Sequence, residues 1–165
     1  MGQITKEQDS RRVFIDSLVE AATQDPKICL IVPDVGFNYC EKFKERFPDR
    51  YFNLGVTETS VVPIAAGMAL SGMKPYVYSM INFVLFRPGE MVRNCVVKHQ
   101  ANVKLIGVKG SNAYKFLGFS HNLLHDDEDI NFCKNIGLDW IVATTNVDRM
   151  FKEILSLKKP VYVRL

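Results

Sequence analysis

The chain lacks the features that mark several simple functional classes. Its four cysteines are scattered with no C-x-x-C pair, a spacing that excludes a zinc ribbon or a thioredoxin-type redox site and argues against a disulfide framework. No apolar run reaches the roughly 18 residues of a membrane helix. The formal net charge of +3 is mild, and no basic block with interleaved aromatics appears, so nucleic acid is not favoured as a partner. These absences predict a cytoplasmic protein.

The common phosphate-binding and nucleophile motifs are also missing. The sequence contains no G-x-G-x-x-G, no G-x-x-x-x-G-K-[ST] and no G-x-S-x-G. The chain therefore has no recognisable phosphate-gripping loop of its own.

The 165 residues, 47% of them hydrophobic, are enough for one compact domain spanning residues 1–165. Helical patterns alternate with six strand-like runs at 28–34, 50–56, 74–80, 102–110, 138–144 and 160–165. This order predicts an α/β fold, with three layers and a mostly parallel sheet between helices. Ligands of such sheets bind beyond the carboxyl ends of the strands, here the loops at 34–38, 55–58, 79–86 and 110–121.

Glu58 stands at the head of a helix that is otherwise small and apolar. No charged residue occurs from Ser60 to Gly72. A surface acid at a helix start gains roughly 0.3–1 kcal/mol from the positive end of the helix. The alternative is a carboxylate held in a closed interior for chemistry, and the residue types alone leave both open.

An aromatic stripe follows the third predicted strand. Met80, Phe83 and Phe86 recur at a spacing of three and precede Arg87-Pro88-Gly89. Such a stripe packs into a core by default. Because it begins at the carboxyl end of a strand, it can equally form the wall of a site for a flat heteroaromatic ring.

Two histidines precede an acidic run. His121 and His125 stand four residues apart and are followed by Asp126, Asp127, Glu128 and Asp129. We expect the acids to cap and charge the next helix rather than to bind a metal. His121 is expected on a loop, as a substrate-contacting group.

The stretch "NLGVTETSVVPIAAGMALSGMKPYVYSMINFVLFRPGEMVR" resembles the pyrimidine-binding domain of transketolase-like thiamine diphosphate enzymes. That family includes deoxyxylulose-phosphate synthase and the beta subunits of 2-oxoacid dehydrogenases. Its pattern is a Gly, two residues, the catalytic Glu and a small-residue helix, then Pro-Tyr and an aromatic loop ending near an Arg. The similarity spans nearly the whole chain and implies the thiamine diphosphate-binding fold.

The resemblance also assigns cofactor-binding residues. It implies that Glu58 contacts the N1′ atom of the cofactor's aminopyrimidine and so activates thiamine diphosphate. Phe83 matches the residue that stacks on the pyrimidine, Phe86 a second ring and Met80 a position often held by Phe. Asp34 matches an acid near the active-site entrance.

Further positions match substrate-binding residues of the family or depart from them. His121, in "GFSHN", resembles a catalytic, substrate-contacting histidine, and Arg11 an arginine that grips a sugar phosphate. Lys109 stands in place of another substrate histidine, Leu117 in place of an acid, and Asn38 in place of a phosphate-binding Ser. These departures argue against an ordinary pentose phosphate, although a cationic Lys109 suits a phosphorylated or nucleotide-linked sugar.

The resemblance stops short of a complete enzyme. No G-D-G run with a downstream Mg²⁺-binding Asn occurs, and the family's diphosphate-binding and C-terminal domains are absent. We therefore expect one half of a split transketolase that moves a two-carbon ketol unit between sugars. A separate diphosphate-binding subunit would hold Mg²⁺, in an α2β2 assembly, and no metal ligand is expected in this chain.

Three alternatives remain at this point. A beta-type component of a 2-oxoacid decarboxylase or dehydrogenase shares the Glu and aromatic positions. A catalytically inactive structural subunit would have no need of Glu58 with Phe83. A flavodoxin-like binding module fits the strand count and leaves both residues unexplained.

Overall fold

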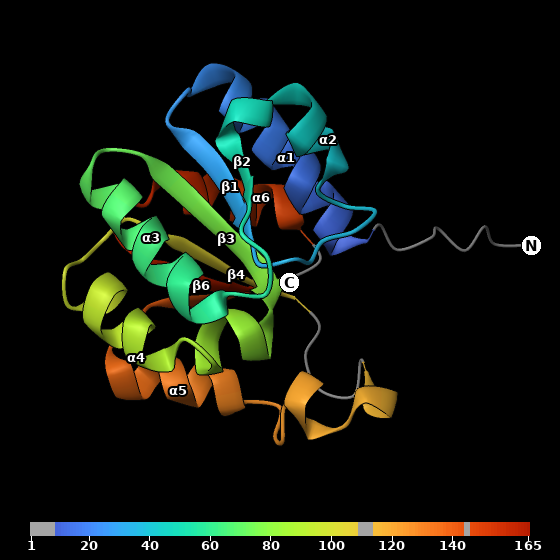
Figure 1. The fold of residues 1–165 in the computed structure, drawn as a ribbon, viewed down its shortest axis with the longest axis vertical. Helices are drawn as coiled ribbons and strands as arrows, with labels where there is room; N and C mark the ends of the chain where they lie inside the picture. Colours follow the sequence, from blue (N-terminus) through green and yellow to red (C-terminus); the bar gives the residue numbers. More distant parts are fainter. Residues whose placement is uncertain (1–8, 109–113, 144–145) are drawn as a thin grey trace, which may run out of the picture.

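The structure, a computed structural model, describes residues 9–108, 114–143 and 146–165. At its centre lies a sheet whose strand pairs, within these residues, are all parallel (Figure 1). From one edge to the other the strands are β2 (Tyr51–Asn53), β1 (Ile28–Val32), β3 (Lys74–Met80), β4 (Lys104–Val108), β6 (Val161–Arg164) and β5 (Trp140–Val142). The expected α/β fold with six strands is confirmed.

Helices cover both faces of the sheet (Figure 1). One face carries α1 (Ser10–Gln24), α2 (Glu41–Arg46) and α6 (Val147–Ser156). The other carries α3 (Glu58–Leu70), α4 (Gly89–Met91), α5 (Glu128–Ile136) and two π-helices, Asn82–Phe86 and Val92–Val97. Short 3₁₀-helices occupy Pro48–Arg50, Lys115–Leu117 and Phe119–His121. Each face has its own hydrophobic core, so the molecule has three layers.

The sequence explains this burial. The strands "ICLIV" and "KLIGV" are buried at every position, as expected for parallel strands covered on both faces. Helix α3 packs through Val61, Val62, Ala65 and Ala66, whose small side chains let it lie close to the sheet. This packing fixes Glu58, the first residue of α3, at the carboxyl edge of the sheet.

Gly107 leaves room for a hydrogen bond between Tyr162 of β6 and Asp129 of α5 in the core. A Cβ atom on Gly107 of β4 would lie 2.7 Å from the hydroxyl oxygen of Tyr162, so only glycine leaves room for that ring. The Tyr162 hydroxyl donates to Asp129 Oδ2 of α5 at 2.6 Å, and Asp129 Oδ1 accepts from Arg164 at 3.0 Å. Burial and then the Asp129 charge raise the pKa of Tyr162, so the hydroxyl remains a donor.

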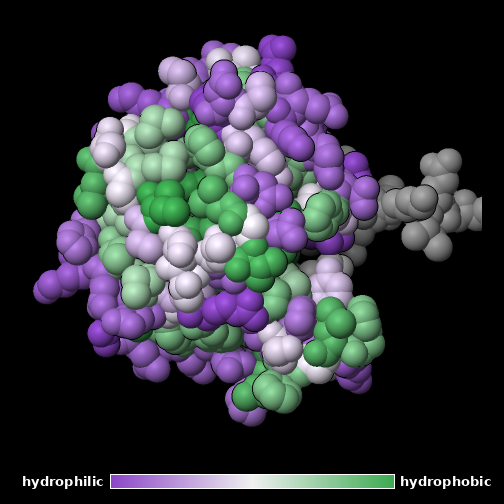
Figure 2. Space-filling view, in the orientation of Figure 1, coloured by the Kyte–Doolittle hydropathy of each residue, from purple (hydrophilic) through white to green (hydrophobic). Residues whose placement is uncertain are grey.

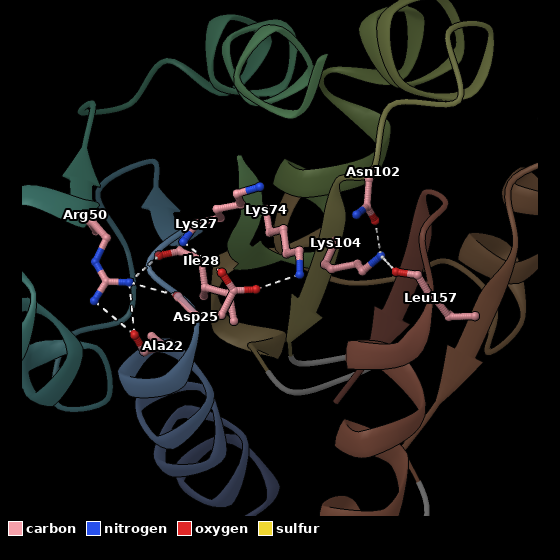
Figure 3. Close-up of polar contacts among 9 residues, drawn as sticks. All are labelled: Ala22, Asp25, Lys27, Ile28, Arg50, Lys74, Asn102, Lys104 and Leu157. Carbon is pink, nitrogen blue, oxygen red and sulfur yellow. Dashed lines mark hydrogen bonds and ion pairs between the residues drawn. The ribbon is translucent and has the colours of Figure 1, made fainter. Parts of the chain in front are cut away.

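Arg50 ties the amino edge of the sheet to the end of α1 (Figure 3). Its guanidinium donates to the carbonyl oxygens of Ala22, Asp25 and Ile28 at 3.0–3.2 Å. Nearby, the Lys74 ammonium contacts the Asp25 carboxylate at 2.6 Å. The hydrogen bond from Lys74 lowers the pKa of Asp25. Carbonyls left over at the end of α1 thereby find donors.

Lys104 makes a second tie at the same edge (Figure 3). The residue is only 4% exposed, and its ammonium donates to the carbonyls of Leu157 at 3.0 Å and Lys159 at 2.8 Å and to the side-chain oxygen of Asn102. Three acceptors match its three N–H groups, which makes burial of the charge tolerable. Burial lowers the pKa of Lys104 to about 8.

The sequence of residues 88–100, "PGEMVRNCVVKHQ", predicts a helix, and the structure gives it a different form. It consists of the short α4 followed by the π-helix Val92–Val97. The aromatic stripe is also π-helical, over Asn82–Phe86. A sequence pattern of period 3.6 does not distinguish these wider turns from an α-helix.

No helix among the described residues is long and apolar enough to cross a membrane.

Candidate active site

A pocket of about 580 Å³ opens at the carboxyl ends of the strands β1, β2, β3 and β4. We call this side of the sheet its carboxyl edge and the opposite side its amino edge. Ligands of parallel sheets bind at this edge. Its lining residues come from α1, from the loops after these strands, from the aromatic π-helix and from the segment around His121: Arg11, Pro33, Asp34, Val35, Gly36, Phe37, Tyr39, Val56, Glu58, Tyr78, Met80, Phe83, Arg87, Val108, Tyr114, Leu117 and His121.

Glu58 and Phe83 both line the pocket, and Arg87 contacts both of them. The Glu58 side chain is only 6% exposed, and its Oε1 accepts a hydrogen bond from Arg87 Nη1 at 2.6 Å. The Arg87 guanidinium carbon lies 4.1 Å from the centroid of the Phe83 ring. One planar N–H donor thus bonds the carboxylate while lying over the aromatic ring. Glu58 is a sequestered group, not a surface acid.

His121 also contacts the Phe83 ring. Its imidazole meets Phe83 edge-on, with centroids 4.9 Å apart and an interplanar angle of 82°. The Ser120 hydroxyl oxygen lies 2.9 Å from His121 Nδ1. This contact leaves Nε2 to exchange a proton or a hydrogen bond with a bound molecule.

The loop after β1 brings Asp34 to the pocket in a conformation that few residues adopt. Asp34 has a φ of +53°, in the left-handed region. Its backbone N–H donates to Asn53 Oδ1 at 3.1 Å, and the same oxygen accepts from the N–H of Gly55. The side chain of Asn53 therefore links the loop after β1 to the loop after β2. Strained backbone of this kind concentrates at functional sites.

Arg11, in the first turn of α1, forms the far wall. Its Nε and Nη2 donate to the two oxygens of Asp9 at 2.9 and 2.6 Å, and its guanidinium lies 4.1 Å from the centroid of the Tyr39 ring. The Tyr39 hydroxyl donates to Asp9 Oδ2 at 2.7 Å. The hydrogen bond from Arg11 holds the pKa of Asp9 far below its ordinary value, so the carboxylate is charged at any physiological pH.

The structure brings most of the expected site residues together. Arg11, Asp34, Glu58, Met80, Phe83 and His121 all line the pocket.

Two expected residues are not part of this lining. Phe86 packs edge-on against Phe132 of α5, with centroids 5.5 Å apart. Residues three apart share a face of an α-helix, but the π-helix has a wider turn, so Phe83 and Phe86 diverge. Asn38 is exposed, and its backbone N–H donates to the Glu41 side chain.

Lys109, the remaining substrate-binding expectation, lies outside the described residues. Within the described part of the chain, no group of three or more His, Cys, Asp or Glu side chains could hold a metal ion.

The sequence did not indicate the roles of three residues in or next to the pocket: Arg87, Tyr39 and Asp9. Arg87 was noted only as the end of the aromatic loop, and neither Asp9 nor Tyr39 was singled out. Arg87 and Glu58 are 29 residues apart in the sequence, and Tyr39 and Asp9 are 30 apart. No local sequence pattern therefore predicts either contact. An acid two residues before Arg11 was the one signal available.

Apolar side chains are exposed around the pocket. Figure 2 shows them gathered over α3, whose Ile64 and Leu70 are exposed, as is Val56 in the preceding loop. Phe116, in the 3₁₀-helix Lys115–Leu117, and Phe119, in the 3₁₀-helix Phe119–His121, are 82% and 80% exposed. Such patches are typical of interaction surfaces.

The fold and the pocket together define a class. The domain is a parallel α/β domain, and its pocket lies at the carboxyl ends of the strands. The pocket holds a sequestered carboxylate, Glu58, beside the Phe83 ring. These features define the class of ligand-binding α/β domains. More particularly, residues 6–165 match the family described as "Transketolase, pyrimidine binding domain". The chain belongs to that family, which confirms the resemblance and replaces the flavodoxin-like alternative.

Individual relatives agree with this assignment. The chain is 31% identical over 156 residues to one subunit of the apulose-4-phosphate transketolase of Phocaeicola vulgatus, covering 94% of this chain and 50% of that protein. It is 35% identical over 147 residues to the 1-deoxy-D-xylulose-5-phosphate synthase of Mycobacteroides abscessus, covering 86% of this chain and 22% of that protein.

A solved structure of a split-gene transketolase, described as an inactive β4 tetramer, superposes with a TM-score of 0.80 at 27% identity, covering 94% of this chain and 50% of that one. The chain thus spans half the length of this structure and of the Phocaeicola relative.

Proposed function

We propose that this chain is the pyrimidine-binding subunit of a two-subunit, thiamine diphosphate-dependent transketolase-like enzyme. The reaction is transfer of a two-carbon ketol unit between sugars. The observation that carries the proposal is the buried Glu58 carboxylate at the start of α3, facing the same pocket as the Phe83 ring. The Phocaeicola relative, which is named as one subunit of a transketolase, supports the split arrangement.

The residues present fit the aminopyrimidine end of the cofactor. Arg87 already places a planar N–H donor against both Glu58 and Phe83. An aminopyrimidine ring is likewise planar and can be bonded through a ring nitrogen. When bound, thiamine diphosphate supplies the carbon nucleophile and electron sink for cleaving and forming C–C bonds.

The chain's own residues then have separate tasks. Glu58 would hold a hydrogen bond to a ring nitrogen of the aminopyrimidine, and its burial would keep water from competing for that bond. Phe83 supplies a stacking face, with Met80 beside it in the pocket lining. His121 and Asp34 remain at the pocket for the hydroxyl and carbonyl groups of the sugar.

A partner subunit completes the proposal. It would bind the diphosphate and Mg²⁺ and would cover the exposed apolar side chains Val56, just before Glu58, and Ile64 and Leu70, further along α3, in an α2β2 assembly. We also place the enzyme in the cytoplasm. All four cysteines lie in described residues and are unpaired thiols, which suits a reducing compartment.

Two alternatives are outcomes of the test. A beta-type 2-oxoacid component would use the same Glu58 on a different donor. An inactive structural subunit would assemble without turnover, a case for which the inactive β4 tetramer of the split-gene transketolase gives a precedent.

The test begins with co-purification of the partner from the native cell. Thiamine diphosphate and Mg²⁺ are then titrated calorimetrically into each chain and into the complex, and ketol transfer is assayed. We expect tight binding only with both chains present, and a roughly 10²–10⁴-fold lower kcat for Glu58→Gln. Glu90→Gln, which removes an exposed acid outside the pocket, is the matched control. Unchanged turnover in Glu58→Gln would refute the assignment.

A further inference from the structure

Asp9 and Arg11 form a closed pair at one wall of the pocket. Oδ1 of Asp9 accepts from the backbone N–H and the Nε of Arg11, and Oδ2 accepts from Arg11 Nη2 and from the Tyr39 hydroxyl, all at 2.6–3.1 Å. A carboxylate offers about four acceptor sites, so these contacts use them all. Because the Tyr39 ring also covers the guanidinium, Arg11 is held on one edge and one face.

The charges around the described pocket are therefore largely compensated. Besides His121, the charged residues in its lining are Arg11, Arg87, Glu58 and Asp34. Arg87 is paired with Glu58, and Arg11 is paired with Asp9.

Among these described lining residues, the charge that remains uncompensated is the negative charge of Asp34. Asp34 contacts only the amide of Asn53 among its side-chain hydrogen bonds in the described residues, at 3.4 Å. A phosphate dianion entering here would meet an Arg11 whose charge Asp9 already compensates, and it would be repelled by Asp34. An uncharged hydroxyl can donate to Asp34 and accept from the N–H groups that Arg11 keeps on its other edge.

We propose that Asp9 is a specificity-determining residue: by holding Arg11, it selects a substrate whose end at this wall carries uncharged hydroxyl groups over one that ends in a phosphate. The choice of a sugar as substrate rests on the proposed function, but the Asp9–Arg11–Tyr39 contact does not. Arg11 keeps the position that the resemblance gives to a phosphate-gripping arginine, without an uncompensated charge.

The test is a binding titration of the full chain that follows the NMR signals of Arg11 and Tyr39. The probes are inorganic phosphate, D-ribose 5-phosphate and D-ribose. Asp9→Asn removes the charge and keeps a side chain that caps a helix equally well, so α1 should remain folded. Asp9→Ser, also a favoured cap, releases Arg11 completely and serves as a second variant.

We expect both variants to bind the two phosphate probes at least about tenfold more tightly than the unmodified chain, as a released charge-assisted donor allows. Affinity for D-ribose should change little. Asp16→Asn is the matched control, because it removes one negative charge from the same helix at a pair with Lys42. It should not increase phosphate binding.

Three results would overturn the proposal. The unmodified chain could bind phosphate at Arg11 as tightly as the variants do, neither variant could gain affinity, or Asp16→Asn could gain as much. The titration needs neither a partner subunit, nor thiamine diphosphate, nor turnover. A failure of the proposed enzymatic function would therefore be recognised separately from a failure of this proposal.

Discussion

Two cationic residues at the amino ends of the strands and two at the carboxyl ends differ in what they contact. At the amino edge, Arg50 and Lys104 donate mainly to backbone carbonyls (Figure 3). At the carboxyl edge, Arg11 and Arg87 donate to the carboxylates of side chains. A carbonyl of the chain cannot leave without local unfolding, whereas a side-chain pair can be exchanged for a ligand. The contacts at the amino ends of the strands are therefore suited to stability, and those at the carboxyl ends are suited to exchange with a ligand.

Backbone strain and exposed apolar side chains also occur at the carboxyl edge, near the pocket. The loop after β1 holds Asp34 and Asn38 in the left-handed region, with φ of +53° and +67°. Phe116 and Phe119 leave large apolar rings exposed near the pocket. Strain and exposed apolar area both lower stability and are retained where function needs them.

The largest expected effect tests the amino edge. Lys104→Met keeps the length of the side chain and removes the ammonium, which leaves the carbonyls of Leu157 and Lys159 without this donor. We expect the free energy of unfolding to fall by about 1–3 kcal/mol, measured by urea denaturation. Lys98→Met, at an exposed position, should change it by less than about 0.5 kcal/mol. Equal losses in the two variants would break the comparison.

The pH dependence of the same variant gives a second readout. Burial lowers the pKa of Lys104 in the folded chain to about 8, against 10.5 in an ordinary environment. Between these values the unfolded chain binds more protons, so the contribution of Lys104 to stability grows as pH rises. The stability difference between the unmodified chain and Lys104→Met should increase by up to about 1.4 kcal/mol per pH unit from pH 8 to 10. A constant difference would show that Lys104 titrates normally.

A smaller effect separates the two aromatic residues of the stripe. Phe83→Leu should weaken binding of thiamine diphosphate to the assembled enzyme by about 0.5–1.5 kcal/mol, because a stacking face is lost. Phe86→Leu should leave that affinity unchanged and lower the melting temperature, because Phe86 contacts Phe132 instead of the pocket. Calorimetric titration and thermal unfolding of both variants check this. Weaker cofactor binding in Phe86→Leu alone would reverse the assignment.

The smallest expected effect concerns Arg87. Its side chain is 42% exposed, and a pair this accessible is worth roughly 0.2–1 kcal/mol. If its guanidinium must move before a ring can bind, Arg87→Met should increase the affinity of the chain for thiamine by up to about fivefold, measured by calorimetry. Arg93→Met, outside the pocket lining, is the control. A loss of affinity would mean that Arg87 holds the ring rather than covering its site.

The fold was predictable because burial in a parallel sheet leaves a strong apolar signal. The strand over residues 74–80 has the bounds expected from its sequence, and the others are shorter than their apolar runs. Glu58 could be found because a lone carboxylate heads an uncharged helix. Phe86 was misplaced relative to the pocket because the period of a π-helix is invisible in the sequence.

The pairing of charges could not be read from the sequence. Arg87 reaches Glu58 only because the π-helix after β3 returns over the start of α3. Which cation neutralises which carboxylate depends on side-chain distances, and composition gives only their sum. The Asp9–Arg11 pair is local, yet its importance appears only once Tyr39 and the pocket are placed beside it.

The strand order has a consequence for how the chain is made. β5 pairs only with β6 among the described strands, and β6 also completes the edge of β4. During synthesis, β4 and β5 therefore leave the ribosome before their shared neighbour exists, and pairing of distant strands is slow. The described sheet is complete only once β6 is in place, so an interruption of translation shortly before Val161 would leave two open strand edges exposed to aggregation.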